Sequence, residues 1–175
     1  MILIFGMGNP GEQYQNTRHN AGHSVVDFLA GNAVWGGKKR LSAVIAEGMI
    51  GHKKIIFAKS LNYMNESGAA VAAVACFFKI KPENILVVHD EIDLKLGTWK
   101  LQHNRGAGGH HGVESVIKAL GTSAFWRLRV GILPEKKPVD TATFVLKPFL
   151  KKEHELFATH LDNLQQVVLN WLQTP

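Results

Sequence analysis

The stretch ILIFGMGNPGEQYQNTRHNAG, residues 2–22, decides how we expect the chain to fold. Residues 2–5 form an apolar run of branched and aromatic side chains that is too short for a helix, so it predicts a buried strand. The loop at residues 6–11 contains three glycines, which can turn sharply and bring bare backbone close to a ligand. Residues 12–20 then gather polar side chains beyond the end of the strand. This arrangement is more typical of the rim of an active site than of a simple connection.

The spacing GxGxxG at residues 6–11 also matches the fingerprint of dinucleotide-binding folds. That fingerprint requires a helix that opens at the glycines and an acidic residue about 20 positions later. Here Pro10 lies between the second and third glycines, and polar residues continue to Asn16 before a helix can begin. Asp27 lies within an apolar helical pattern, where it cannot reach a ribose. We therefore favour a substrate-contacting loop over a plain structural turn, and both over a nicotinamide site.

Length and composition predict one globular domain over residues 1–175, because 46% of the residues are hydrophobic and 19% are charged. The only cysteine, Cys76, excludes an internal disulfide and favours a reducing compartment. The chain starts without a basic leader, and no apolar run approaches the roughly 20 residues that span a bilayer. We expect a cytoplasmic protein that does not enter a membrane.

The charge balance favours an anionic partner. The formal net charge is +6 and the isoelectric point is near 9.5. Such a charge attracts the phosphates of nucleic acids, although many small basic proteins bind nothing in particular.

The rest of the chain alternates between strand and helix patterns. We predict strands at 43–49, 54–59, 85–88, 99–101, 127–133 and 143–146, and helices from about residue 17 or 20 to 34, at 65–78, after the glycine loop 105–112, and along a C-terminal apolar stripe from 156 to 172. Residues 36–40 are expected to be a solvated turn. We expect Asn65 or Ser67 to cap the helix at 65–78, with Cys76 and Phe77 packed inside.

This alternation predicts an α/β fold: a mixed twisted sheet in a single domain, with helices on both faces and an amphipathic C-terminal helix. The strands at 2–5 and 85–88 should bring their polar ends to one rim, where such folds bind ligands.

The residues on that rim could activate a water molecule. A histidine held by a carboxylate keeps one tautomer and can take a proton near neutral pH, and Asp90 could hold His19 in this way. No serine lies in a GxSxG elbow and Cys76 is expected to be buried, which leaves water as the nucleophile. The amides of Asn9 and Asn65 could orient that water and stabilise an oxyanion. Alternatives remain at this stage: His89 could be the partner, Asp90 a loop cap, and Asn65 only a helix cap.

At these residues the sequence resembles the bacterial peptidyl-tRNA hydrolase family over nearly its full length. Five segments carry the resemblance, in the order and at the spacing of the family: GMGNPGEQYQNTRHNAG (6–22), MNESG (64–68), HDEIDL (89–94), GAGGHHG (106–112) and RLRVGI (127–132).

The resemblance implies hydrolysis of the ester that joins a peptide to the 3′ end of tRNA. His19 would be the general base, Asp90 would stabilise its working state, and Asn9 would distinguish an acylated α-nitrogen from a free amine. The substrate cleft would be lined by Tyr14, Tyr63 and Asn65, with Met64 and Asn20 close by. Lys100 and Arg129 are the candidates for contacts with tRNA phosphates. No metal or organic cofactor is implied, and we expect a monomer.

The sequence departs from the family pattern at several positions. His111 replaces the asparagine of the pattern Gly-Gly-His-Asn-Gly, which helps to orient water and substrate, so His111 is a candidate substrate contact with altered chemistry. Gln102 stands where a phosphate-clamping basic residue is frequent, and Arg105 stands where a glycine is usual. Leu133 replaces the last glycine of a Gly-Ile-Gly segment, and the C-terminal tail is short. These differences would fit a divergent copy with reduced activity.

Two other kinds of protein remain as alternatives. A metal-dependent hydrolase could use nitrogen and oxygen ligands from His89, Asp90, Asp93, His103, His110 and His111. An RNA-binding protein without catalysis would bind tRNA in a salt-dependent manner but leave the ester intact.

Overall fold

The apolar run at residues 2–5 becomes strand β1 (Ile2–Gly6), near the middle of the sheet in the computed structural model, which describes residues 1–136 and 138–173. The other strands are β2 (Gly36–Lys38), β3 (Ala43–Ile50), β4 (Lys53–Ser60), β5 (Ile85–Lys95), β6 (Trp99–His103) and β7 (Trp126–Leu133). The α-helices are α1 (Ala21–Ala30), α2 (Ser67–Phe77), α3 (His111–Leu120), α4 (Thr141–Val145), α5 (Lys151–Thr159) and α6 (Leu161–Gln173). Short 3₁₀ turns are η1 (Glu12–Tyr14), η2 (Arg18–Asn20), η3 (Lys39–Leu41), η4 (Met64–Glu66) and η5 (Pro82–Asn84).

The strands form one mixed sheet of seven, in the order β2-β3-β4-β1-β5-β7-β6. The four inner strands, β4, β1, β5 and β7, run parallel, while β2, β3 and β6 pair antiparallel at the two sides. Because β1 and β5 are parallel neighbours, their carboxyl ends meet at one edge of the sheet. The predicted mixed α/β sheet is confirmed.

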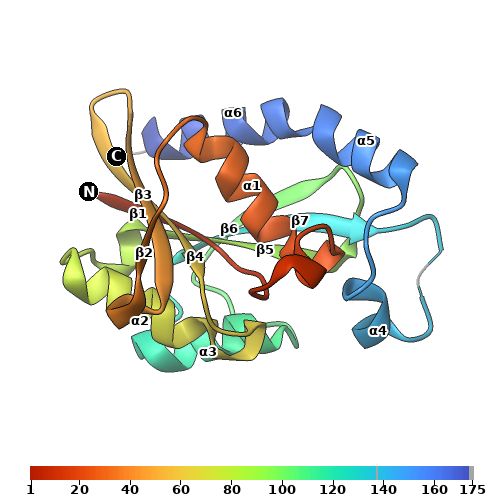
Figure 1. Cartoon of the computed structure of the whole chain (residues 1–175), viewed down its shortest axis with the longest axis horizontal. Coiled ribbons are helices and arrows are strands. Elements are labelled where there is room, and N and C mark those ends of the chain that lie inside the picture. The colour runs from red at the N-terminus through yellow and green to blue at the C-terminus, as the bar shows by residue number, and fades with distance from the viewer. Residues whose placement is uncertain (137, 174–175) are drawn as a thin grey trace.

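Alternation along β1 divides the core between the two faces of the sheet. Ile2 and Ile4 belong to the cluster formed with α1, α5 and α6, whereas Leu3 and Phe5 belong to the cluster formed with α2 and α3. Figure 1 shows these two helical layers above and below the sheet, with α4 at one end. Both faces are covered, which explains why the inner strands are almost continuously apolar.

The strand predicted at 143–146 is wrong, because residues 141–145 form helix α4. Asp140 caps this helix: its side chain accepts a hydrogen bond from the backbone nitrogen of Thr143 at 3.0 Å. The β-branched residues of the segment favoured a strand, but the local cap outweighs that preference.

The single C-terminal helix that we expected is divided into α5 and α6 at His160. The hydroxyl of Thr159 and Nδ1 of His160 both donate to the carbonyl of Leu156, each at 2.8 Å. In a continuous helix that carbonyl would accept from the backbone nitrogen of residue 160, which instead bonds Phe157. Side chains thus compete with the helical hydrogen bond and end the helix.

Three local expectations also fail. Residues 36–38 form edge strand β2, not a turn, and pair with β3. Glu66 precedes α2 as its N-cap without a side-chain hydrogen bond, so neither Asn65 nor Ser67 caps the helix. Cys76 and Phe77 are exposed, because α2 buries the opposite side, at residues 70, 71, 74 and 75.

None of the helices in the described part of the chain has both the length and the apolar character needed to span a membrane.

Gly22 allows α1 to approach the sheet closely. A Cβ atom on Gly22 would lie 2.3 Å from the carbonyl oxygen of Val88 and 2.6 Å from that of Met7. Both neighbours are backbone atoms, which cannot move aside without displacing β5 or the loop after β1. The position of the turn before α1 therefore depends on this glycine.

We expect Gly22→Ala to lower the free energy of unfolding by about 1–3 kcal/mol, because the added methyl group overpacks a rigid contact. Urea unfolding of the variant measures this loss. Gly37→Ala is the matched control, since a Cβ on Gly37 meets nothing within 4 Å and should change stability by less than about 0.5 kcal/mol. Equal effects of the two substitutions would contradict the close-approach explanation.

Candidate active site

A cleft of about 540 Å³ lies where the loops after β1 and β4 meet β5 and the start of α3. Its lining residues are Asn9, Tyr14, His19, Tyr63, Met64, Asn65, Asp90, Glu91, Ile92, Asp93, Gly108, Gly109, His110, His111, Gly112, Thr141, Ala142, Val145 and Leu146. The cleft therefore collects residues from four of the five motif segments identified in the sequence.

His19 and Asp90 form a hydrogen-bonded pair inside this cleft. Nδ1 of His19 lies 2.9 and 3.0 Å from the two carboxylate oxygens of Asp90. We expected Asp90 at the end of a strand, but β5 continues through it to Lys95, and Asp90 pairs with Val130 of β7. Asp90 is therefore held by the sheet, and its side chain is only 4% exposed. It is not a loop cap.

The pair shifts the pKa values of both members. Burial is the largest influence on His19 and disfavours its charged form, but the charge and hydrogen bonds of Asp90 outweigh it and raise the pKa of His19 above its ordinary value. Burial likewise raises the pKa of Asp90, yet His19 and His110 together hold it well below the usual range. Asp90 is therefore ionised at neutral pH, which fixes a proton on Nδ1 of His19 and leaves Nε2 as the basic atom.

His110 is a second histidine on the same carboxylate, and sequence reasoning considered it only as a metal ligand. Its Nε2 lies 3.1 Å from Oδ1 of Asp90, and its Nδ1 accepts a hydrogen bond from the backbone nitrogen of Val113 at 3.3 Å. Because Nδ1 accepts a hydrogen bond, the ring proton is on Nε2, which donates a hydrogen bond to Asp90. The signal that could have found His110 is its place directly after the glycine loop, where a helix begins.

His89 does not share this role. It is fully buried, its Nδ1 donates to the carbonyl of Asp90 at 2.7 Å, and its ring packs edge-on against His110 at 4.7 Å. Burial, followed by the nearby His110, lowers the pKa of His89 well below its ordinary value, so the ring is neutral. His89 supports His110 from behind and does not contact His19.

Asn9 is held from both sides. Its backbone nitrogen donates to Oδ1 of Asn20 at 2.8 Å, and its carbonyl accepts from Nδ2 of Asn20 at 2.9 Å. Its side-chain oxygen accepts from the backbone nitrogen of Met64 at 2.8 Å. The amide orientation is thereby fixed, with the amino group as the remaining donor in the cleft. Asn20 and Met64 are buried; Asn20 fixes Asn9 and does not line the cleft.

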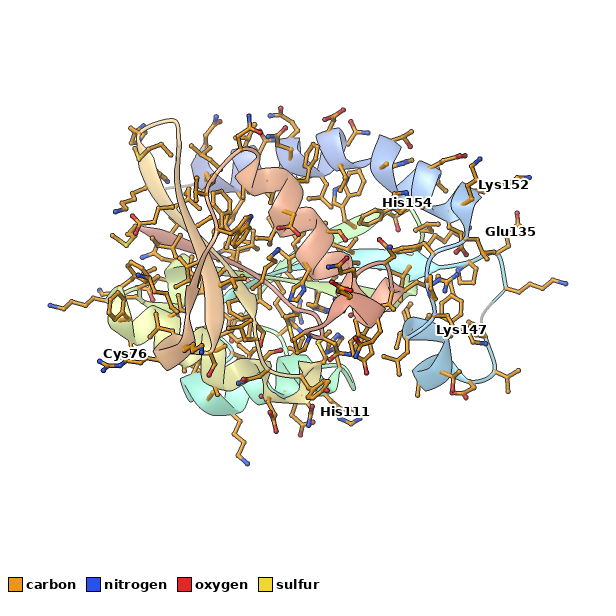
Figure 2. All side chains as sticks on the ribbon, viewed as in Figure 1. Cys76, His111, Glu135, Lys147, Lys152 and His154 are labelled. Carbon is orange, nitrogen blue, oxygen red and sulfur yellow. The ribbon has the colours of Figure 1, made fainter. Side chains whose placement is uncertain are left out.

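The other predicted cleft residues lie around its mouth. The rings of Tyr14 and Tyr63 meet edge to face, with centroids 6.4 Å apart. Asn65 lines the cleft from η4 and is exposed. His111 begins α3; its side chain is 86% exposed and lies 3.8 Å from Glu114, and Figure 2 shows it projecting from the surface. These contacts hold His111 less firmly than Asn9.

Lys100 and Arg129 lie outside the cleft, opposite one another on β6 and β7. Lys100 is exposed. The guanidinium of Arg129 bonds Glu91 through Nε at 2.8 Å and Nη2 at 2.7 Å, and Gln102 through Nη1 at 3.0 Å. Arg129 is therefore partly neutralised, whereas Arg105 on the glycine loop is exposed.

Among the described residues, one cluster could hold a metal ion: the ligand atoms of His19, Asp90 and His110 lie within 4.8 Å of one another. Two imidazoles and a carboxylate suit zinc or a similar transition metal. The larger set of six ligands considered from the sequence does not assemble, because only Asp90 and His110 of that set belong to the cluster.

Sequence reasoning missed one wall of the cleft. Thr141, Ala142 and Val145 of α4 and the following Leu146 line it. The segment had been predicted as a strand, so no part of it was placed near the site. The Asp-Thr-Ala-Thr sequence at 140–143, with a helix-capping acid first, is the signal that could have found it.

The comparisons with known proteins point to the same family as the five sequence segments described above. The family profile for peptidyl-tRNA hydrolase matches residues 3–175. The chain belongs to the peptidyl-tRNA hydrolase family. The peptidyl-tRNA hydrolase of Desulfitobacterium hafniense (strain Y51) is 41% identical over 98% of this chain and 92% of its own length. That of Corynebacterium efficiens is 46% identical over 88% of this chain and 86% of its own length.

Solved structures of peptidyl-tRNA hydrolases share the fold. A complex with N-propanol superposes with a TM-score of 0.89 at 32% identity and covers 97% of this chain and 87% of that chain. The enzyme from Acinetobacter baumannii has a TM-score of 0.87 at 32% identity and covers 95% of this chain and 85% of its own. The expected family and architecture are thus confirmed.

We expect the ring of His19 to titrate above pH 6.5 and, in Asp90→Asn, below it. The substitution removes the charge that raises the pKa of His19 but leaves the burial that lowers it. NMR of the imidazole Cε1 protons measures both midpoints. Glu47→Gln, which removes an exposed carboxylate paired with Lys54, is the matched control and should leave the midpoint of His19 unchanged. An unchanged midpoint for His19 in Asp90→Asn would contradict the assigned role of Asp90.

Proposed function

We propose that the chain hydrolyses the ester between a peptide and the 3′ end of tRNA, with His19 as the general base. The observation that carries this proposal is the pair of His19 and Asp90 in the cleft, with Nδ1 2.9 Å from the carboxylate. Asp90 keeps the proton on Nδ1, so Nε2 can accept a proton from water. Such a base contributes about 10²–10⁴ in rate.

The reaction then proceeds in two proton transfers. Water gives a proton to Nε2 of His19 as its oxygen attacks the ester carbonyl, which forms a tetrahedral oxyanion. The imidazolium returns the proton to the ribose oxygen as the carbon–oxygen bond breaks, and a free peptide and tRNA are released. Asp90 remains ionised throughout and stabilises the imidazolium without taking its proton. No metal or organic cofactor is required.

Asn9 and Asn65 position the substrate. With its side-chain oxygen bound by Met64, Asn9 presents its amino group as a donor. A peptide-linked α-nitrogen brings a carbonyl acceptor next to the ester, and a free aminoacyl group does not. This difference selects peptidyl-tRNA over aminoacyl-tRNA. Tyr14 and Tyr63 supply aromatic surface at the mouth of the cleft.

The tRNA backbone would be bound by cations beside the cleft: the exposed Lys100 and the partly buried Arg129, whose charge is reduced by Glu91. The net charge of +6 favours the same partner. We also infer that the protein works as a cytoplasmic monomer and that residues 1–175 act as one domain.

His19→Ala should reduce turnover of N-acetyl-aminoacyl-tRNA by at least about 10²-fold, because the general base is lost. A release assay of labelled amino acid measures turnover, and filter binding measures tRNA affinity, which should remain within about twofold. His154→Ala is the matched control and should retain full activity. Full turnover by His19→Ala would exclude His19 as the base, and cleavage of free aminoacyl-tRNA at the same rate would exclude the role of Asn9.

A second candidate, tRNA binding with weak catalysis, is favoured by one observation. His111 is 86% exposed and lies 3.8 Å from Glu114, so it orients water less firmly than a fixed amide. His111→Asn should therefore keep or raise kcat, up to about tenfold, as measured by the same release assay. Glu114→Gln is the control, because it removes the carboxylate next to His111 and leaves the imidazole itself unchanged. A collapse of kcat in His111→Asn would show that the imidazole has a catalytic role of its own.

A further inference from the structure

Arg18 is adjacent to His19 in the sequence but points toward a different part of the molecule. Its side chain is only 4% exposed. Nη1 donates to the carbonyls of Lys147 at 3.1 Å and Pro148 at 2.8 Å, and Nη2 pairs with Glu153 at the start of α5. The guanidinium carbon also lies 4.1 Å from the centre of the Phe144 ring on α4. The same carbon lies 5.5 Å from the centre of the Phe149 ring, so one buried cation contacts five residues of the segment from 144 to 153.

The backbone reinforces this contact. The nitrogen of Arg18 donates to the carbonyl of Lys147 at 3.2 Å, and the nitrogen of Phe149 donates to that of Asn16 at 3.1 Å. Thr17 and Pro148 form an isolated antiparallel bridge between the same two segments. The turn that carries His19 and the segment that follows α4 are therefore joined. We call the contacts of Arg18, Phe144, Lys147, Pro148 and Glu153 the Arg18 clasp.

The position of α4 must depend on such contacts. With only five residues, α4 is far too short to be a stable helix without tertiary support. It packs through Phe144 against Arg18, and Lys147, labelled beside α4 in Figure 2, comes two residues after the end of the helix. Lysine could not replace the guanidinium, because it lacks the planar fork that reaches several acceptors at once.

The wall that this clasp supports is largely apolar. Ala142, Val145 and Leu146 line the cleft that also contains His19. A ribose or a phosphate needs polar partners, whereas an amino-acid side chain gains free energy from apolar surface. Of the two parts of the substrate, the peptide therefore fits this wall better than the tRNA.

We propose that Arg18 is a positioning residue: it fixes the α4 wall, and this wall receives the side chain of the amino acid esterified to tRNA. The inference rests on the proposed function and extends it to substrate selection. Because Arg18 does not contact Asp90 or the basic nitrogen of His19, the clasp affects where the peptide lies and not how water is activated.

The test compares N-acetylphenylalanyl-tRNA with N-acetylglycyl-tRNA in steady-state release assays. Arg18→Lys and Glu153→Gln should each raise KM for the phenylalanyl substrate about tenfold and for the glycyl substrate less than about twofold, because glycine has no side chain for the wall to receive. The pH midpoint of kcat should remain that of the wild type. Glu47→Gln is the matched control, since it makes the same change in the exposed pair of Glu47 and Lys54 and should leave both KM values unchanged.

Leu146→Ala removes wall surface without breaking the clasp and should reproduce the selective rise in KM. If Arg18→Lys does not fold, Leu146→Ala and Glu153→Gln still test the proposal. A lower melting temperature with an unchanged ratio of the two KM values would overturn the proposal and leave Arg18 as a structural residue only. If the wild type cleaves neither substrate, the proposed function itself fails, and that result is distinct from an unchanged ratio.

Discussion

The site depends on a carboxylate that is ionised although it is buried. Asp90 lies inside β5 with its side chain almost excluded from solvent, and an isolated charge in such a place would be very unfavourable. Two imidazole N–H groups, from His19 and His110, compensate for the lost water. Because the buried carboxylate needs these two donors, each ring carries a proton on the nitrogen that faces Asp90. Removal of either histidine would change the environment of the acid on which the other depends.

Much of this arrangement could be predicted from the sequence, because the informative signals are local. The apolar run at 2–5 and the polar residues after it predicted a buried strand with polar side chains at its carboxyl end, and β1, paired parallel with β5, has this arrangement. The meeting of His19 with Asp90 was also predicted, since His19 lies in the segment after β1 and Asp90 was expected at the end of the neighbouring strand at 85–88. What could not be predicted was the length of β5, because the polar residues from 89 onward resemble the end of a strand when their tertiary partners are unknown.

The errors have a common physical origin. At 143–146, residue propensity favoured a strand, but the cap at Asp140 and the contact of Phe144 with Arg18 produce a helix. Cys76 and Phe77 were assigned inward because α2 is apolar on most of its surface, so the hydrophobic pattern does not identify the buried side. His110 was overlooked because the sequence does not show that the loop before α3 brings its ring to Asp90. In each case a tertiary contact outweighs a local preference.

The exposure of Cys76 has a consequence for the study of this enzyme in solution. It is the only cysteine of the chain, and it lies on the outer surface of α2, away from His111 at the mouth of the cleft in Figure 2. An accessible thiol at a single position allows the wild-type chain to be conjugated to one fluorophore without any mutation. A probe placed there would report the arrival of a large ligand by anisotropy, with the residues of the cleft left unaltered.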